Sequence, residues 1–441
     1  MRSDRFIWVG AATAAIAVGV LLGFGASGAG VVIIALGGVL MFAFIGGSMA
    51  RVADRTWLAR WVALGFLAKL AGTGARYFMV TELYGVGDSY RYYSVGSQLA
   101  LQWREGNIPP LTGSGGFGTQ ITEAVTGALF AIFTPDMLGG FLMFAIIAYS
   151  GQLLLYAAFR RHAQAHHLKP YALFIFLLPT YAFWPSSIGK DALVLFGLGT
   201  SAYFVSRTLE TFEFRWLFGL GISLVGLGAI RVHIAGLVVG GLIGAALLSR
   251  ISNPLVPGTG LRRLLLLGAG LGAALIVVAV FPDVFGVDIL DSQDRDAFTA
   301  DVVRRTSEKG TVVPGEAASS LLDLPAALIH VLFRPWPWEA TEIQHLLAAA
   351  ETTVIAGLFA WYSPAILRNI GKWRSNPYLV FSTLYTLAFC FFFSAVRNLG
   401  IIARQRGQVL AFFIVLIITL GFEAKEEAEP ATQPALVSSA S

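Results

Sequence analysis

The chain has 441 residues, of which 56% are hydrophobic and 13% are charged, and its formal net charge is +5. A mean hydropathy of +0.70 exceeds what a soluble core absorbs, so the composition excludes an ordinary soluble enzyme and predicts a polytopic membrane protein. Basic cytoplasmic loops explain the sequence pI near 9.3 without nucleic acid, and the single cysteine, Cys390, excludes an intramolecular disulfide.

Apolar runs recur along the chain, and a spanning helix needs about 20 apolar residues. The first run could pass for a signal peptide, but further spans follow it directly, so we interpret it as a retained first helix. The runs cover residues 6–25, 31–49, 61–84, 138–158, 170–184, 191–206, 216–230, 234–249, 264–281, 342–362, 377–395 and 408–422. The sequence therefore predicts an all-α transmembrane bundle of about twelve spans over residues 1–422.

Lys and Arg residues predict the orientation, because cytoplasmic loops carry an excess of them. With the N-terminus inside, the cytoplasmic segments carry Arg2, Arg5, Arg51, Arg55, Arg60, Arg160, Arg161, Lys169, Arg207, Arg215, Arg250, Arg262, Arg263, Arg368, Lys372 and Arg374. Both termini are then cytoplasmic, and the polar tail over residues 423–441 is expected to be disordered.

Two longer segments, residues 85–137 and 282–341, are expected on the external face. The first contains GVGDSYRYYSVGSQLALQW, with an apolar stripe at helical spacing that predicts a helix lying along the membrane surface. The stripe consists of Tyr92, Val95, Leu99 and Trp103. The second segment has a charged middle and an interfacial end, LLDLPAALIHVLFRPWPWEA, which is suited to the headgroup level.

The stretch FWPSSIGKDALVLF places charges inside an apolar region. Pro185 breaks the helix because its ring cannot donate a backbone hydrogen bond, and Lys190 and Asp191 then open the returning helix at an external tip. One interpretation is a self-satisfied ion pair at a helix start, where an aspartate is favourable in any case. The other is a functional site, since membrane-edge charges are costly.

Other external helix ends also carry cations, where the positive-inside rule predicts few. Each alone could be a snorkelling side chain at a helix end. Together they indicate a cationic pocket for an anionic lipid headgroup, because the arginine fork suits phosphate and diphosphate. The candidate binding residues are Lys190 and Asp191, Arg231 and His233 at an expected tight turn, Arg334 and Glu339, and Arg397, Arg404 and Arg406.

Asp88 is the candidate catalytic residue, because it follows the third expected span and precedes the surface helix. It would be a general base that deprotonates an attacking sugar hydroxyl, although a capping aspartate is the simpler alternative. Alternative acids are Glu123, Glu339 and Glu342, and Lys69 or Arg76 could pair with Asp88 or another acid.

GDSYRYY, with its membrane-edge Asp88 and an amphipathic helix behind it, resembles the C-type glycosyltransferase superfamily. FWPSSIGKD, IRVHIAG, FRPWPWEA and NLGIIARQR resemble patterns of bacterial O-antigen or capsule repeat-unit polymerases. The first resemblance implies a multi-span enzyme of the bacterial plasma membrane that takes sugars from polyprenyl-phosphate carriers. The second implies external arginines that grip the lipid diphosphate. The superfamily usually has its Asp loop after the first span, whereas here the loop follows the third.

The leading hypothesis is therefore a membrane glycosyltransferase or glycan polymerase that uses a polyprenyl-(di)phosphate-linked sugar on the external face. Its partners would be that lipid-linked glycan and membrane lipid, with no nucleic acid. No cofactor is expected, although a divalent metal is not excluded. A transporter or flippase for an anionic lipid-linked substrate is the alternative, since broken helices suit a substrate path. A scaffold in an envelope complex is a third hypothesis.

Overall fold

The computed structural model describes residues 38, 45, 47, 56–85, 87–109, 116–132, 136–211, 213–250, 268, 272, 292–307, 311–313, 317–340 and 342–422. Within these ranges the protein has 14 α-helices, a few 3-10 and π turns, and one isolated bridge between Val312 and Asn398. The all-α prediction is confirmed for this part of the chain. The expected tail, residues 423–441, lies outside it.

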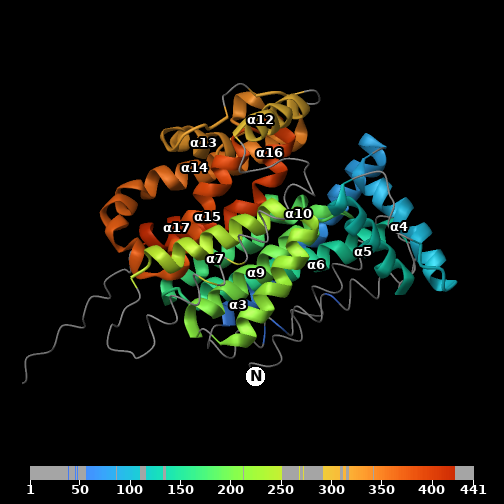
Figure 1. Ribbon diagram of the computed structural model, residues 1–441, viewed down its shortest axis with the longest axis horizontal. Coiled ribbons are helices and arrows are strands. Elements are labelled where there is room, and N and C mark those ends of the chain that lie inside the picture. Colours follow the sequence, from blue (N-terminus) through green and yellow to red (C-terminus); the bar gives the residue numbers. More distant parts are fainter. Residues whose placement is uncertain are drawn as a thin grey trace, which may run out of the picture.

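Figure 1 shows how the helices pack side by side into a bundle. In chain order they are α3 (Thr56–Phe78), α4 (Asp88–Arg104), α5 (Phe117–Ile132), α6 (Met137–Arg160), α7 (Ala165–Leu177), α8 (Pro179–Phe183), α9 (Lys190–Thr211), α10 (Phe214–Leu248), α12 (Ser292–Ser307), α13 (Leu324–Leu332), α14 (Ile343–Asn369), α15 (Pro377–Phe393), α16 (Leu399–Gln405) and α17 (Gly407–Gly421).

The expected number of about twelve spans is wrong. Among the described residues, four helices are long and apolar enough to cross a membrane, or five if the bent pair α16 and α17 forms one span. The expected run 170–184 is divided between α7 and the five-residue α8, and α15 has only 17 residues. The runs 6–25, 31–49 and 264–281 fall almost entirely outside the described residues. The long apolar helices indicate a multi-pass membrane protein.

The 35-residue α10 is two helical arms joined at Arg231, whose φ of −146° and ψ of 91° are not helical. A Cβ built on Gly228 would lie 3.6 Å from the Ala235 side chain. Seven residues of straight helix would separate these positions by roughly 10 Å, so the second arm folds back beside the first. The chain thus turns sharply at Arg231.

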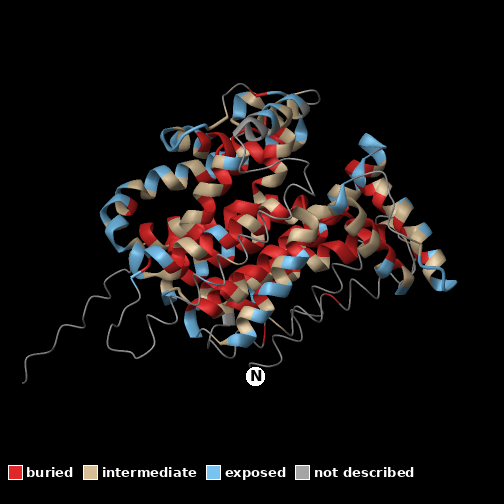
Figure 2. Cartoon of the chain, in the orientation of Figure 1, coloured by how far each residue is buried: buried red, intermediate tan, exposed pale blue. Residues whose placement is uncertain are grey.

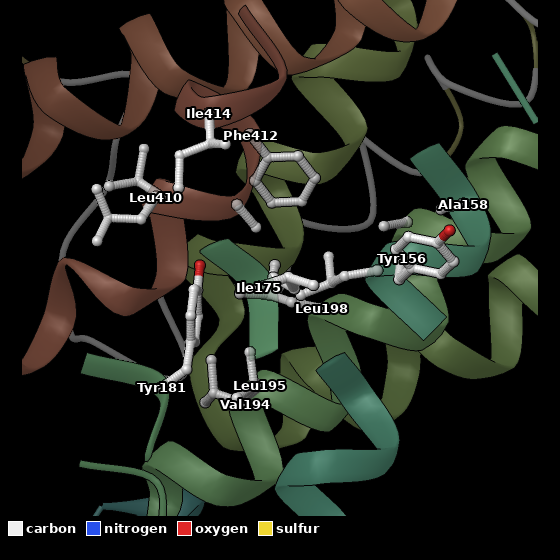
Figure 3. Close-up of a cluster of buried hydrophobic side chains, with 14 of the residues drawn as sticks. Tyr156, Ala158, Ile175, Tyr181, Val194, Leu195, Leu198, Leu410, Phe412 and Ile414 are labelled. Atoms are coloured by element: carbon white, nitrogen blue, oxygen red, sulfur yellow. The ribbon is translucent and has the colours of Figure 1, made fainter. Parts of the chain in front are cut away.

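Small residues allow a close contact between α6 and α9. A Cβ on Gly199 would lie 2.3 Å from the Gly151 carbonyl oxygen, so only glycine allows this approach. Large apolar side chains fill the space beside that contact. Figure 3 shows them converging from α6, α7, α8, α9 and α17, among them Tyr156, Tyr181 and Phe412. Figure 2 shows the buried residues on the inner helix faces and the exposed ones on the outer faces of α4 and α14.

Helix ends expected in the cytoplasm meet at one end of the bundle. Asn376 donates to the His162 carbonyl, Arg374 Nε donates to the Leu248 carbonyl, and the rings of His166 and His167 lie 3.2 Å from the Phe422 carbonyl oxygen. These contacts join α6, α7, α10, α15 and α17. The candidate site is formed elsewhere, by the end of α3, the starts of α4 and α9, the turn inside α10 and helix α16.

The segment 85–137 forms the two packed helices α4 and α5. The apolar stripe of α4 was expected to face the membrane surface, but part of it packs against α5. A Cβ on Gly127 of α5 would lie 2.8 Å from Leu99 and 3.4 Å from Trp103. The predicted helix is correct, and α5 covers part of its apolar face because it presents small residues such as Gly127 there.

Candidate functional site

The site begins at the break in FWPSSIGKD. Helix α8 ends at Phe183, and α9 begins at Lys190, so the predicted break around Pro185 is confirmed. The turn between them is held by α4, because Ser89 Oγ donates to the Ile188 carbonyl at 2.9 Å. This contact brings the starts of α4 and α9 together, and with them Asp88 and Asp191.

Asp191 is the centre of the site. Its Oδ1 accepts from Arg231 Nη2 at 3.1 Å, and its Oδ2 accepts from Arg404 Nε. The side chains of Asp191, Arg231 and Arg404 are 13%, 11% and 29% exposed, so water screens these charges only partly. Among the described residues, Asp191 forms ion pairs with these two arginines and not with the adjacent Lys190. The self-satisfied Lys190–Asp191 pair is therefore not observed.

Asp88 lies beside Arg404, with 3.8 Å between Oδ2 and Nη1, and its side chain is 68% exposed. It is the first residue of α4, whose N-cap is Gly87, and no side chain caps this helix end by a hydrogen bond. The capping alternative is therefore wrong. The carboxylate faces a cation on one side and open space on the other.

Two more cations surround Asp191. Arg76, at the end of α3, interacts electrostatically with Asp191, Asp88 and Arg404, and Lys190 interacts with the same three residues. The Arg76 guanidinium lies 5.4 Å from the Phe183 ring centre and 5.2 Å from that of Trp184, so aromatic faces hold it from behind.

Four cations, Arg76, Lys190, Arg231 and Arg404, surround two carboxylates and leave a net charge of about +2 at the site. Two of their buried nitrogens, Arg76 Nε and Arg231 Nη1, have no hydrogen-bond partner among the described residues. Buried donors are normally paired, so the cluster has spare donors as well as spare positive charge. This arrangement is suited to an anion with several acceptor oxygens, such as a phosphate or diphosphate.

Tyr92 forms the wall on the α4 side. Burial, together with the charge of Asp88, raises the pKa of Tyr92 to about 12, so its hydroxyl stays protonated. His233 lies behind Arg231 and interacts with the charges of Arg231 and Lys190, while its ring packs 5.8 Å from that of Phe393. It therefore packs between α10 and α15, behind the charged cluster.

Arg334 and Glu339 belong to a second group, away from Asp191. Arg334 Nε lies 3.1 Å from Glu339 Oε1, and its Nη1 lies 3.2 Å from His330 Nδ1. His330 Nε2 lies 2.8 Å from the Val396 carbonyl oxygen. Arg397 is 6% exposed and its charge also acts on His330. These residues line or adjoin a separate cavity beside α13.

Arg406 is a structural residue. It is fully buried, its Nη2 lies 3.5 Å from Glu351 Oε1, and its Nη1 donates to the Arg334 carbonyl at 2.7 Å. Glu351 Oε2 also accepts from the Thr180 backbone nitrogen. Lys69 is likewise buried and donates to the Tyr181 carbonyl, so it does not pair with Asp88. These contacts hold helices together and leave no face for a substrate.

The alternative acids lie elsewhere. Glu123 is 3% exposed and pairs with Arg91 at 2.8 Å, which joins α4 to α5. Glu342 precedes α14 and accepts from the Gln344 amide. Within the described ranges, no three His, Cys, Asp or Glu side chains are grouped closely enough to hold a metal ion.

The sequence pattern therefore identified five members of the cluster, Asp88, Lys190, Asp191, Arg231 and Arg404, but not how they are paired. Arg76 was expected only as a pairing partner for an acid, although Lys69 and Arg76, seven residues apart in the apolar run 56–78, share one helix face and were the available signal. Glu351 and His330 carried no signal that separates them from ordinary helix residues. Comparison of the chain with family models, curated proteins and solved structures finds no match.

Proposed function

We propose that the protein is a membrane glycosyltransferase or glycan polymerase that uses a sugar linked to a polyprenyl phosphate or diphosphate. The observation that carries the proposal is the gathering of Arg76, Lys190, Arg231 and Arg404 around Asp191, with exposed Asp88 at the edge. A lipid phosphate at the membrane edge supplies the negative charge and the oxygens that this cluster can bind, while its chain stays among apolar helices.

In the proposed reaction, the phosphate of the donor binds the cationic cluster. An acceptor hydroxyl oxygen attacks the anomeric carbon, the bond from that carbon to the phosphate oxygen breaks, and the phosphate leaves with the electron pair. Asp88 takes the hydroxyl proton and passes it to water, which its 68% exposure allows. The cluster stabilises the charge that develops on the leaving phosphate.

The test compares the variants Asp88→Asn and Arg404→Gln with the control Arg215→Gln. Arg215 lies beside Glu213 at the start of α10 and is 65% exposed, so its replacement removes one arginine outside the cluster. Envelope glycan is measured in producing cells after membrane insertion of each variant is verified. Loss of glycan in both cluster variants with a normal control is expected. Normal glycan in all three would refute the proposal.

A transporter or flippase for the same lipid-linked substrate is the second candidate, because two helices are broken beside the cluster. The chain turns at Arg231 within α10, and α16 and α17 meet at 58° next to Arg404. Broken helices at a charged site are typical of transporters. If Arg404→Gln leaves the lipid-linked donor on the cytoplasmic leaflet, transport is favoured; if the donor collects on the external leaflet unused, transfer is favoured.

A further inference from the structure

A cavity of about 430 Å3 lies between α13, residues 317–323 and the turn that follows Arg334. Its size falls in the range of small-molecule sites, which begins at about 300 Å3. Small side chains leave the space open, among them Ala318 on the loop and Ala326 and Ala327 on α13. The cavity belongs to the second group of residues and not to the Asp191 cluster.

One wall of the cavity is a fixed aromatic face. Trp336 lines the space, and the ring of Trp338 stacks on it with 5.5 Å between ring centres and 6° between planes. The Trp336 backbone nitrogen also donates to Glu339 Oε2 at 2.9 Å. An indole held in this way offers a flat apolar surface with little loss of side-chain entropy on binding.

The charged groups at the cavity each have a partner within the protein. Arg334 pairs with Glu339, and Asp323 is held by the backbone nitrogens of Ser319 and Ser320. His330 Nδ1 accepts from Arg334, since a guanidinium can only donate, and its Nε2 therefore donates to the Val396 carbonyl. Burial lowers the pKa of His330, which keeps this neutral form.

The cavity and the Asp191 cluster differ in charge. The cluster carries an excess of cations. In the cavity, Arg334 is already paired with Glu339, so an anion would gain little binding free energy there. Ready hydrogen-bond donors and acceptors beside a flat aromatic face are suited to a neutral polyol. Such a ligand packs its C–H groups on the indole and bonds its hydroxyls to the charged side chains.

The two sites are braced by neighbouring residues of one bent helix pair. Arg404 reaches Asp191, and Arg406 holds the backbone carbonyl of Arg334 at the cavity. From this arrangement we infer that the cavity beside Trp336 is a binding site for a neutral saccharide unit, distinct from the phosphate site. The assignment of the saccharide as part of the substrate depends on the function proposed above; the binding site itself is tested separately.

The experiment uses the full chain in detergent micelles. Saturation-transfer NMR measures binding of glucose, galactose, mannose and N-acetylglucosamine, and phosphorus line broadening measures binding of inorganic pyrophosphate. Trp336→Ala removes the flat wall, and Ala326→Phe fills the cavity while it keeps the tryptophan. Trp361→Ala is the matched control, because this residue is 79% exposed on α14 and does not line the cavity.

At least one sugar is expected to bind the unchanged protein. Both cavity variants should reduce its signal by about tenfold or more, since truncation of an aromatic anchor has effects of this size. The control should keep the sugar signal, and all three variants should keep pyrophosphate binding. A sugar signal that survives both cavity variants, or no sugar signal in the unchanged protein, would overturn the inference. If the unchanged protein binds a sugar but does not bind pyrophosphate, that result would instead count against the phosphate site and the proposed function.

Discussion

Replacing Asp191 by Asn tests whether this carboxylate holds the site together. The change keeps the size of the side chain but removes the charge that Arg231 and Arg404 share. It raises the net charge of the cluster from about +2 to about +3, leaves Arg231 without its carboxylate partner and leaves Arg404 with only the exposed Asp88. Removing one partner of a buried ion pair costs about 3–5 kcal/mol, and partial exposure of Arg404 favours the lower value, about 3 kcal/mol.

The matched variant is Asp88→Asn, which removes a carboxylate from the same cluster. Asp88 is 68% exposed and lies 3.8 Å from Arg404, and an exposed pair of this kind contributes less than about 1 kcal/mol. The two substitutions are chemically identical, so a difference between them reports burial and pairing. We therefore expect a large loss of stability at position 191 and almost none at position 88.

The chain offers a direct assay of this difference. Its single cysteine, Cys390, is fully buried, so a maleimide dye reacts with it only when the bundle opens. At about 2 °C per kcal/mol, the midpoint of thermal unfolding should fall by roughly 6 °C in Asp191→Asn and by less than 2 °C in Asp88→Asn. Equal midpoints for the two variants would show that Asp191 does not stabilise the helix ends, and would refute the reasoning.

Three further predictions concern other parts of the molecule. Arg406→Gln and Glu351→Gln should each lower stability by about 3–5 kcal/mol, whereas the apolar pair Arg406→Met with Glu351→Leu should restore most of it; a double variant as unstable as the singles would contradict this. Asp88→Asn should abolish glycan formation in cells while Asp88→Glu keeps a part of it, and equal activity would exclude a base at this position. Burial, together with neighbouring His166, lowers the pKa of His167 to about 4, so its contribution to stability is complete above about pH 6.5 and is lost as the pH falls towards 4. Thermal unfolding followed by tryptophan fluorescence, which needs no reactive thiolate, should show a loss of up to about 3 kcal/mol over that window, and His167→Gln should reduce it.

The all-α class follows directly from the sequence, because hydropathy and helical periodicity are local properties of a stretch of chain. The same holds for the break around Pro185, since its ring removes a backbone donor wherever it stands. The amphipathic pattern of GDSYRYYSVGSQLALQW correctly indicated α4, but it could not tell a membrane surface from the face of α5. An apolar stripe requires only an apolar neighbour, and the sequence of one helix does not say which neighbour it meets.

The number of spans was overestimated because an apolar run does not determine where a helix ends. The run 170–184 contains Pro179, where the chain leaves α7 and begins the short α8. Burial by neighbouring helices permits short and broken helices that lipid alone would not.

The sequence by itself determined that this protein is helical, strongly apolar and rich in cations at helix ends. Only the tertiary structure decided which charges meet. Asp191 bonds Arg231 across 40 positions and Arg404 across 213, while Arg406, two residues from Arg404, turns to Glu351 instead. The physical reason is that composition and periodicity are local, whereas an ion pair depends on where helices cross, and those crossings are set by small-residue contacts such as Gly151 with Gly199.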